Sequence, residues 1–303
     1  MSADKSLDAL RQEIDAIDDN IHDLIMARTE VVKQVREAKR GQAVKIRPAR
    51  ECSILYRLIG RHKGPFPKRE LARIWRELIV ATLSFEGPFS IAVHMPDAAG
   101  PDEPRHDRRS GRWNMARDQY GSFTPMTGFS SARRLVDAVR KLETTIGVMS
   151  VPELGDVNPW WPHLASKRPD TPRIITRLPF IGSPEDRGPN DQALVICPVA
   201  PEPTGRDRTY LVVETGEQIS LERLGASLKK SLMEPFFMAV WRDPDTPLRS
   251  LYLAEVDGFI SDEDSKIMRL SENLDGVASS IMSIGSYGLP LTPEELETGT
   301  EDL

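Results

Sequence analysis

The chain has 303 residues, with 40 Lys and Arg against 46 Asp and Glu and a formal net charge of −6. This length suggests about two domains. An apolar content of 39% allows a sizeable core. The mixed charge gives no general reason to expect a nucleic-acid or membrane partner. No apolar run is long enough to span a bilayer and no signal-peptide core is found, so we expect neither a membrane span nor export.

Cysteine and histidine usage argues against a disulfide framework and against a metal centre. Cys52 and Cys197 suit a reducing compartment, so we expect a cytoplasmic protein. The five histidines are scattered singly, and no Gly-rich phosphate loop is present. We therefore expect no metal and no cofactor.

Residues 5–40 contain neither Gly nor Pro and carry a heptad repeat. The predicted helix would be about 54 Å long at 1.5 Å per residue. Because that exceeds the diameter of a small domain, its apolar seam needs a partner of similar length, and a homodimer is the simplest solution. The seam consists of Leu7, Leu10, Ile14, Ile17, Ile21, Leu24, Val31, Val35 and Ala38.

One seam position carries Arg28 instead of an apolar residue. A charge there is costly unless an anion meets it. Lys39 follows eleven residues later, which places it about 20° from Arg28 on the same helix face. Arg11 lies about 100° away, so we expect it to reach a pocket on the antiparallel partner helix instead.

Two shorter helices are predicted to follow, one from about Pro48 and one over residues 68–86. The first turn of the former carries Arg50 and Glu51. Thr82 and Glu86 extend the apolar stripe of the latter, which contains Leu71, Trp75 and Ile79. Together with Arg28 these groups predict a cationic pocket for a small polyanion inside a helical bundle.

Such a pocket pairs no nucleophile with a base. It suits a reaction that needs only orientation and electrostatic stabilisation of a dianionic substrate. Taken singly, most of these residues have ordinary structural explanations: exposed arginines and lysines are solvated, Glu51 favours a helix N-terminus, and Thr82 packs. Only their joint occurrence in one pattern favours a site.

Residues 7–86 resemble the all-helical chorismate mutases of the AroQ type. The matching segments are LRQEIDAIDDNI at 10–21, Arg28, KQVREAK at 33–39, RPARE at 47–51 and WRELI at 75–79. The resemblance implies a three-helix domain that forms an intertwined dimer. It also implies an isomerase of aromatic amino acid biosynthesis that converts chorismate to prephenate by a Claisen rearrangement.

The same resemblance implies roles for seven residues. The catalytic residues would be Arg28, Lys39, Glu51 and Glu86, and the substrate-binding set adds Arg11, Arg50 and Thr82. Arg11 would come from the neighbouring subunit and hold the substrate carboxylates with Arg28. Lys39 would donate to the ether oxygen, Arg50 would support the pocket, and Glu51 would accept from the ring hydroxyl. Thr82 would contact a carboxylate, and Glu86 would have to be protonated to donate to the ether oxygen.

Residues 88–190 predict a truncated α/β lobe. Strands are expected at 89–95, 145–151 and 173–181, with a helix at 131–143. Residues 96–128 are expected to be mostly loop, and their basic run at 105–112 more often marks a solvated loop than a nucleic-acid contact. The Pro-rich loop at 152–172 carries Trp160–Trp161, for which we expect a packed lid or a dimer contact.

Residues 191–291 alternate strand and helix signals in the order βαββαβ, which predicts a small α+β domain. Residues 292–303 form an acidic tail that we expect to fray. The overall fold class is therefore a three-helix domain followed by an α/β lobe and this α+β domain.

The C-terminal two thirds faintly resemble a shortened prephenate dehydratase followed by an ACT regulatory domain. LVDAVRKLETTIGVMSVP at 135–152 and TRL at 176–178 are similar to dehydratase segments, and AEVDGFI with SIGSYG is similar to the end of an ACT domain. The Gly-Pro-x-Gly-Thr-Phe opening is missing, PELG at 152–155 replaces Glu-Asn-Ser, and there is room for about one of the two dehydratase lobes. We therefore predict no dehydratase activity.

The sequence thus predicts a chorismate mutase that binds chorismate and prephenate, with a regulatory or structural C-terminal region. An aromatic amino acid effector is possible, although RDP at 242–244 only weakly echoes the effector motif. Two alternatives stay open. One is a bifunctional mutase–dehydratase, and the other is a non-catalytic aromatic amino acid sensor.

Overall fold

The computed structural model describes residues 5–38, 46–86, 88–96, 111–182, 192–244, 246 and 249–297, without the side chains of 84–86. The three predicted N-terminal helices are confirmed as α1 (Leu7–Ala38), α2 (Pro48–Arg61) and α3 (Lys68–Glu86). Pro48 occupies the first turn of α2, where its missing N–H leaves no hydrogen bond unmade.

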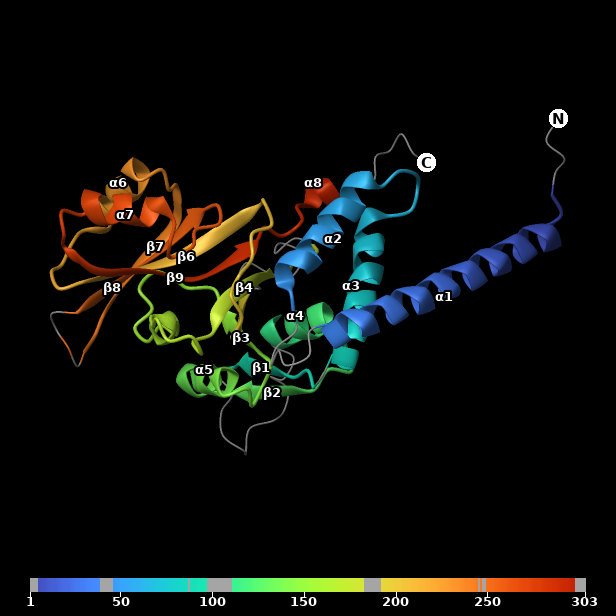
Figure 1. Ribbon diagram of the computed structural model, residues 1–303, viewed down its shortest axis with the longest axis horizontal. Coiled ribbons are helices and arrows are strands. Elements are labelled where there is room, and N and C mark those ends of the chain that lie inside the picture. Colours follow the sequence, from blue (N-terminus) through green and yellow to red (C-terminus); the bar gives the residue numbers. More distant parts are fainter. Residues whose placement is uncertain are drawn as a thin grey trace.

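Helix α1 projects away from the rest of the molecule, and only its C-terminal part lies against α3 (Figure 1). None of its 32 residues is buried. The seam residues from Leu7 to Val35 are among the most exposed large apolar side chains of the described chain. The apolar seam predicted from the heptad is therefore present and uncovered in a single chain.

The remaining chain is built on one nine-stranded sheet of order β2-β1-β3-β5-β4-β9-β6-β8-β7. The pairs β1–β2, β1–β3 and β4–β9 are parallel, and all other pairs are antiparallel. The strands are β1 (Ile91–His94), β2 (Met126–Phe129), β3 (Ile146–Ser150), β4 (Arg173–Leu178), β5 (Ala193–Cys197), β6 (Asp207–Thr215), β7 (Pro235–Arg242), β8 (Ser250–Asp257) and β9 (Ala278–Gly288).

The second half of this sheet has the predicted βαββαβ order. It runs β6, α6 (Leu221–Lys230), β7, β8, α7 (Ser265–Asn273) and β9. Both helices cover one face of these strands, where Leu224, Leu228 and Leu270 pack against the sheet (Figure 1). Helix α6 is capped by the Ser220 side chain, which accepts from Arg223 N.

The opposite face of the same strands is covered by the 152–172 segment. This segment contains the short 3₁₀ helix η2 (Trp161–Leu164), and both tryptophans are buried in the core. Trp160 Nε1 donates to Ser150 O at 2.9 Å. Both tryptophans are therefore packed into the core of a single chain.

The two halves of the sheet meet where Ile174 of β4 pairs with Gly285 of β9. Gly285 has φ of 139°, and a Cβ built there would lie 2.2 Å from Ile174 N and 2.3 Å from Ile174 O. Only glycine lets the two backbones approach this closely. The α/β lobe and the βαββαβ unit thus form one continuous sheet.

Two expectations need correction. The 96–128 segment contains α4 (Gly111–Tyr120) and β2, because Met115, Ala116 and Tyr120 pack into the core beside β1. Residues 105–110 of the basic run lie outside the described residues, and Arg112 donates from α4 to His94 O at 3.0 Å. The tail does not fray at its start, because Thr292 forms a capping box with Glu295 and starts α8 (Pro293–Leu296).

Strand β5 belongs to the first half of the sheet, where it pairs with β3 and β4. Helix α5 (Ala132–Arg140) also packs there, confirming the helix expected at 131–143. Among the described helices, none combines the length and apolar character needed to cross a membrane.

Helices α2 and α3 dock on the C-terminal region. Leu55 and Ile59 of α2 share a core cluster with Phe180, Leu291 and Leu296. At the edge of this cluster Tyr56 donates to Leu289 O, and the Arg206 guanidinium lies 4.6 Å from the Tyr56 ring centroid. Arg47 Nη2 lies 2.7 Å from Glu202 Oε2. The three-helix domain is therefore anchored to the rest of the chain.

Candidate functional site

Arg28 is the seam residue that the structure connects to α3. Its Nη1 donates to Leu78 O at 3.3 Å, and its side chain is half-buried. This burial lowers the pKa of the guanidinium. The Arg28 guanidinium therefore lies against α3, while its role in a substrate site stays a prediction.

Thr82 lies one turn beyond Leu78 and is buried. Its Oγ1 donates to Leu78 O at 3.2 Å and to Ile79 O at 2.7 Å. Arg28 and Thr82 therefore meet at the same carbonyl, so the structure brings these two predicted site residues together. The Thr82 hydroxyl currently satisfies its own helix, as threonine often does.

Glu51 is buried, with 8% of its surface exposed, and forms an ion pair that the sequence did not predict. Its Oε2 accepts from Arg76 Nη1 at 2.5 Å. Arg76 is itself 3% exposed, and its Nε donates to Gln119 O of α4 at 2.6 Å. Its guanidinium also lies 5.3 Å from the Tyr120 ring centroid. Within the described residues no contact joins Glu51 to Arg28.

The environment of Arg76 favours its charged form. Burial by itself would lower the pKa of the guanidinium, but the neighbouring Glu51 carboxylate and Tyr120 outweigh it, so the pKa is raised. Burial has the opposite effect on an acid, and it raises the pKa of the Tyr120 hydroxyl. The Arg76 guanidinium is therefore held in its charged form in the interface between α2, α3 and α4.

Arg76 was missed as a site residue although it lies in the WRELI segment. The buried stripe of α3 includes Ala72, Arg76, Ile79 and Leu83, with spacings of four, three and four, and Thr82 beside them. A stripe through Leu71 and Trp75, as expected from sequence, places Arg76 one position outside it. With the correct stripe, the argument that singled out Arg28 would also have singled out Arg76.

The other predicted site residues are not brought together by a single chain. The Arg11 side chain is 66% exposed, and its Nη1 lies 3.3 Å from Asp8 Oδ1. Arg50 is exposed on the first turn of α2. Lys39 lies outside the described residues, and so does the side chain of Glu86, whose backbone ends α3.

One chain therefore offers part of a cationic pocket along α1 and α3. Arg28 is half-buried against α3, while Arg11 lies far along the projecting helix with its seam uncovered. A second copy of α1 would have to contribute for these guanidinium groups to surround one dianion. Within the described residues, no group of three or more His, Cys, Asp or Glu could hold a metal ion.

The sequence matches one family model and several curated proteins. Residues 10–87 match the chorismate mutase type II family. The bifunctional chorismate mutase/prephenate dehydratase of Stutzerimonas stutzeri is 35% identical over 103 residues, which cover 32% of this chain and 28% of that protein. The enzyme of the same description from Pseudomonas aeruginosa is 33% identical over 103 residues, with coverages of 32% and 28%. The chain thus spans little more than a quarter of these relatives.

Solved structures align with a larger part of the chain at low similarity. The quorum quenching acylase GqqA aligns with 70% of this chain and 100% of its own, with a TM-score of 0.46 and 12% identity. Prephenate dehydratase from Streptococcus mutans aligns with 67% of this chain and 98% of its own, with a TM-score of 0.45 and 9% identity.

The sequence match and the three observed helices coincide over the first part of the chain. Residues 10–87 are therefore a chorismate mutase type II domain.

Proposed function

We propose that the chain is a chorismate mutase that converts chorismate to prephenate in aromatic amino acid biosynthesis. The observation that carries this proposal is the position of Arg28, a guanidinium on an apolar seam that turns toward the Leu78–Thr82 turn of α3. The family match over residues 10–87 supports the same assignment.

The working form in this proposal is a homodimer through α1. A 32-residue helix is about 48 Å long, and its uncovered seam can be buried along its whole length by a second copy. Burying a Leu or Ile side chain stabilises an association by roughly 1.5–3 kcal/mol, so several such residues from each chain provide a sufficient driving force.

Substrate binding follows from the charges that the dimer would assemble. Arg28 and the partner's Arg11 would hold the two carboxylates, because a guanidinium matches a carboxylate with two parallel hydrogen bonds. Arg50 would add positive charge at the start of α2. Thr82 would turn its hydroxyl from its own helix carbonyls to a substrate carboxylate.

The rearrangement forms one carbon–carbon bond and breaks one carbon–oxygen bond within the substrate, so no group of the protein needs to become covalently attached. Lys39 and a protonated Glu86 would stabilise the negative charge that grows on the ether oxygen as this bond breaks. Glu51, positioned by Arg76, would accept a hydrogen bond from the ring hydroxyl. These groups act by orientation and electrostatics.

The C-terminal region would be regulatory or structural. Thr176 of the TRL segment is buried and hydrogen-bonds to the Tyr120 side chain, which favours a packing role over a reacting one. An aromatic amino acid is a possible effector of this region. The alternative of a bifunctional mutase–dehydratase is kept because the curated relatives carry that description.

The test is to incubate the purified full chain with chorismate and identify the product by chromatography. We expect prephenate to form rapidly with the wild-type chain and with an Arg134→Ala control, and about 100-fold more slowly with Arg28→Ala. Formation of phenylpyruvate would instead establish the bifunctional alternative. Recovery of unchanged chorismate, together with a thermal shift on adding Phe or Tyr, would favour the sensor.

A further inference from the structure

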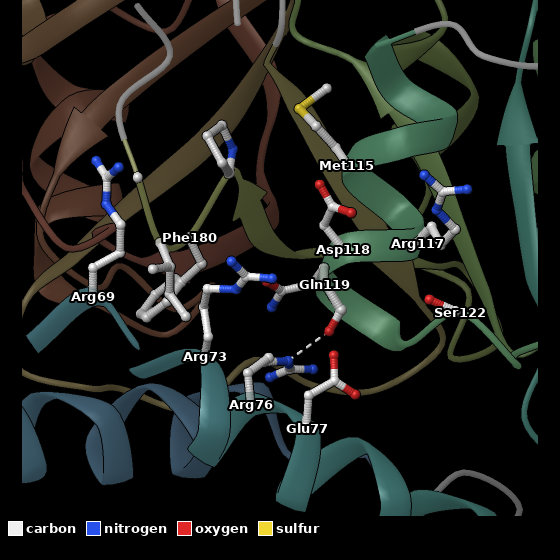
Figure 2. Close-up of a pocket in the computed structure, with 13 residues that line it drawn as sticks. Arg69, Arg73, Arg76, Glu77, Met115, Arg117, Asp118, Gln119, Ser122 and Phe180 are labelled. Atoms are coloured by element: carbon white, nitrogen blue, oxygen red, sulfur yellow. Dashed lines mark hydrogen bonds between the residues drawn. The ribbon is translucent and has the colours of Figure 1, made fainter. Parts of the chain in front are cut away.

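A cavity between α3, α4 and the segment after β4 is lined by charges that hold these elements together (Figure 2). Arg76 pairs with Glu51 and donates to Gln119 O, the dashed line in Figure 2. Arg73 Nη1 lies 3.8 Å from Glu70 Oε2. These charged groups of the lining therefore already have partners within the protein.

Another cavity, of about 340 Å³, lies where the two halves of the sheet meet. It is enclosed by the turn before β4, the loop after β5, the loop after β8, and β9. Its volume is within the range of pockets that hold small organic ligands.

This cavity is separate from the RDP segment at 242–244 that weakly echoes an effector motif. Arg242 ends β7 and pairs with Ser250 at the start of β8. The cavity instead uses the loop that follows Asp257, the last residue of β8. The length of β8, roughly 23 Å for seven steps of 3.3 Å, separates the two places.

One residue of β9 anchors two opposite charges in the cavity lining. Arg173 Nη1 donates to Ser283 O at 3.1 Å, and Asp262 Oδ1 accepts from Ser283 N at 2.6 Å. The N–H and C=O groups of one strand residue point to the same side, so the two side chains are neighbours. They nevertheless form no ion pair with each other or with any other described residue.

The Arg173 guanidinium is held by backbone oxygens, which do not neutralise its charge. Its Nη2 donates to Ser166 O at 3.2 Å. Burial lowers the pKa of the Arg173 side chain, and the Asp262 carboxylate partly offsets this effect. A half-buried cation of this kind gains from a ligand carboxylate that reaches it through the cavity.

Lys167 adds a second cation to the same lining. It is exposed, and within the described chain it forms no ion pair. The neighbouring Arg168 contributes less charge, because its Nε lies 3.2 Å from Asp170 Oδ1. Lys167 and Arg173 are therefore the cations available to a ligand.

The remaining wall of the cavity is apolar. It contains Val199, Phe259 and Ile260, together with prolines on either side of the opening at 169, 198 and 201. A ligand that fits this lining needs an apolar body as well as charged groups.

We propose that this cavity binds an α-amino acid with an apolar side chain. The ligand carboxylate binds Arg173 and Lys167, the ammonium group binds Asp262, and the side chain packs against Phe259. An α-amino acid carries its two opposite charges on one carbon atom, which matches two opposite charges anchored to one residue of β9.

The proposal gives a location to the effector that the proposed function leaves open, and to that extent it rests on that function. Binding itself does not require mutase activity. A calorimetric result therefore stands whether or not the chain converts chorismate.

The experiment is titration calorimetry of the full chain with L-phenylalanine and two analogues that each lack one charge. We expect one site per chain for L-phenylalanine. 3-Phenylpropionate lacks the ammonium group and 2-phenylethylamine lacks the carboxylate, so each should bind about tenfold more weakly or worse. An analogue that binds as tightly as L-phenylalanine, or no binding of L-phenylalanine at millimolar concentration, would overturn the proposal.

Three variants test the location. Asp262→Asn keeps an oxygen for Ser283 N but loses the charge, so it should weaken L-phenylalanine about tenfold and leave 3-phenylpropionate unchanged. Glu263→Gln makes the same change at the next exposed position, outside the lining, and should have no effect. Lys167→Ala should weaken both ligands about threefold.

The outcomes that contradict this location are distinct. Equal affinity for L-phenylalanine in wild type and Asp262→Asn would place the ligand elsewhere and overturn the proposal. Equal losses in Asp262→Asn and Glu263→Gln would reduce the effect to net charge and would overturn it too. Unchanged affinities in Lys167→Ala would contradict the position of the carboxylate.

Discussion

The carboxylate of Glu51 and the guanidinium of Arg76 form a buried ion pair at 2.5 Å, at the point where the mutase helices meet the C-terminal region. Arg76 extends this contact to the backbone of α4 through Gln119 O. A residue expected to bind substrate is thus held in place by the interface between the two parts of the chain. Glu51 therefore links the mutase helices to the C-terminal region through Arg76.

Removing one partner of this pair should destabilise the protein strongly. We expect Arg76→Ala to lower the free energy of unfolding by about 3–5 kcal/mol, because it leaves the Glu51 charge buried without a counter-charge. Urea denaturation followed by circular dichroism measures this loss. Arg73→Ala, one turn earlier on the solvent side, serves as the control and should change stability by less than about 0.5 kcal/mol. Similar losses in both variants would show that the pair has no structural role.

Arg28 should be required for catalysis more than for folding. We expect Arg28→Ala to lower kcat/KM by about 100-fold, since a charged, partly desolvated hydrogen bond contributes roughly 3 kcal/mol. Arg28→Lys should also fail, because an ammonium cannot replace the two-pronged contact. Steady-state kinetics with chorismate checks both variants. Arg36→Ala, an exposed position on the same helix, should retain activity. Full activity in Arg28→Lys would contradict the bidentate role.

Activity should fall as pH rises if Glu86 donates to the ether oxygen. Only the protonated carboxyl group can donate, so the active form is present below its pKa and is lost above it. The change Glu86→Gln supplies a donor at every pH and should flatten the profile. A wild-type kcat/KM that does not vary with pH would argue against this role.

The joint between the two halves of the sheet should tolerate no side chain at Gly285. In Gly285→Ala the new Cβ would collide with Ile174 N and O at 2.2 and 2.3 Å. We expect a loss of about 3 kcal/mol or more in unfolding free energy, because the backbones must separate. Gly216→Ala is the matched control, since nothing lies within 4 Å of its Cβ position. Thermal unfolding of both variants measures this difference in stability. A wild-type melting temperature for Gly285→Ala would refute the close contact.

The two cysteines should be unreactive in the folded protein. Burial, together with charge repulsion from the nearby Glu51, raises the pKa of the Cys52 thiol to about 12. At pH 8 the thiolate fraction, and with it the alkylation rate, should fall about 10³-fold below that of an ordinary thiol. Cys197 is buried as well. Iodoacetamide labelling should therefore require urea, and rapid labelling without it would mean that these thiols are accessible.

Much of the fold could be predicted from sequence where the apolar pattern is strong. The heptad of α1 and the strands of the βαββαβ unit are such cases. Helix α4 was missed because its residues are largely polar, and it is stabilised by packing of Met115 and Tyr120 into the core. Tertiary packing of this kind outweighs local propensity and leaves little trace in a sequence.

The candidate site was predictable to a similar extent. Arg28 could be found because it interrupts a long and regular seam. The partner of Glu51 could not, because the buried stripe of α3 is set by α4, which was expected to be loop. The buried face of α3 thus depends on α4, a helix that the sequence analysis did not predict.

In the proposed dimer, one mutase pocket takes Arg28 from one chain and Arg11 from another. The most direct test mixes Arg11→Ala and Arg28→Ala chains under conditions that allow the dimers to exchange, and then measures prephenate formation. Half of the dimers formed at random would be mixed, and each mixed dimer would keep one intact pocket of two, so we expect about a quarter of the wild-type activity. Activity in the mixture no higher than the mean of the two separate variants would contradict a pocket shared between chains.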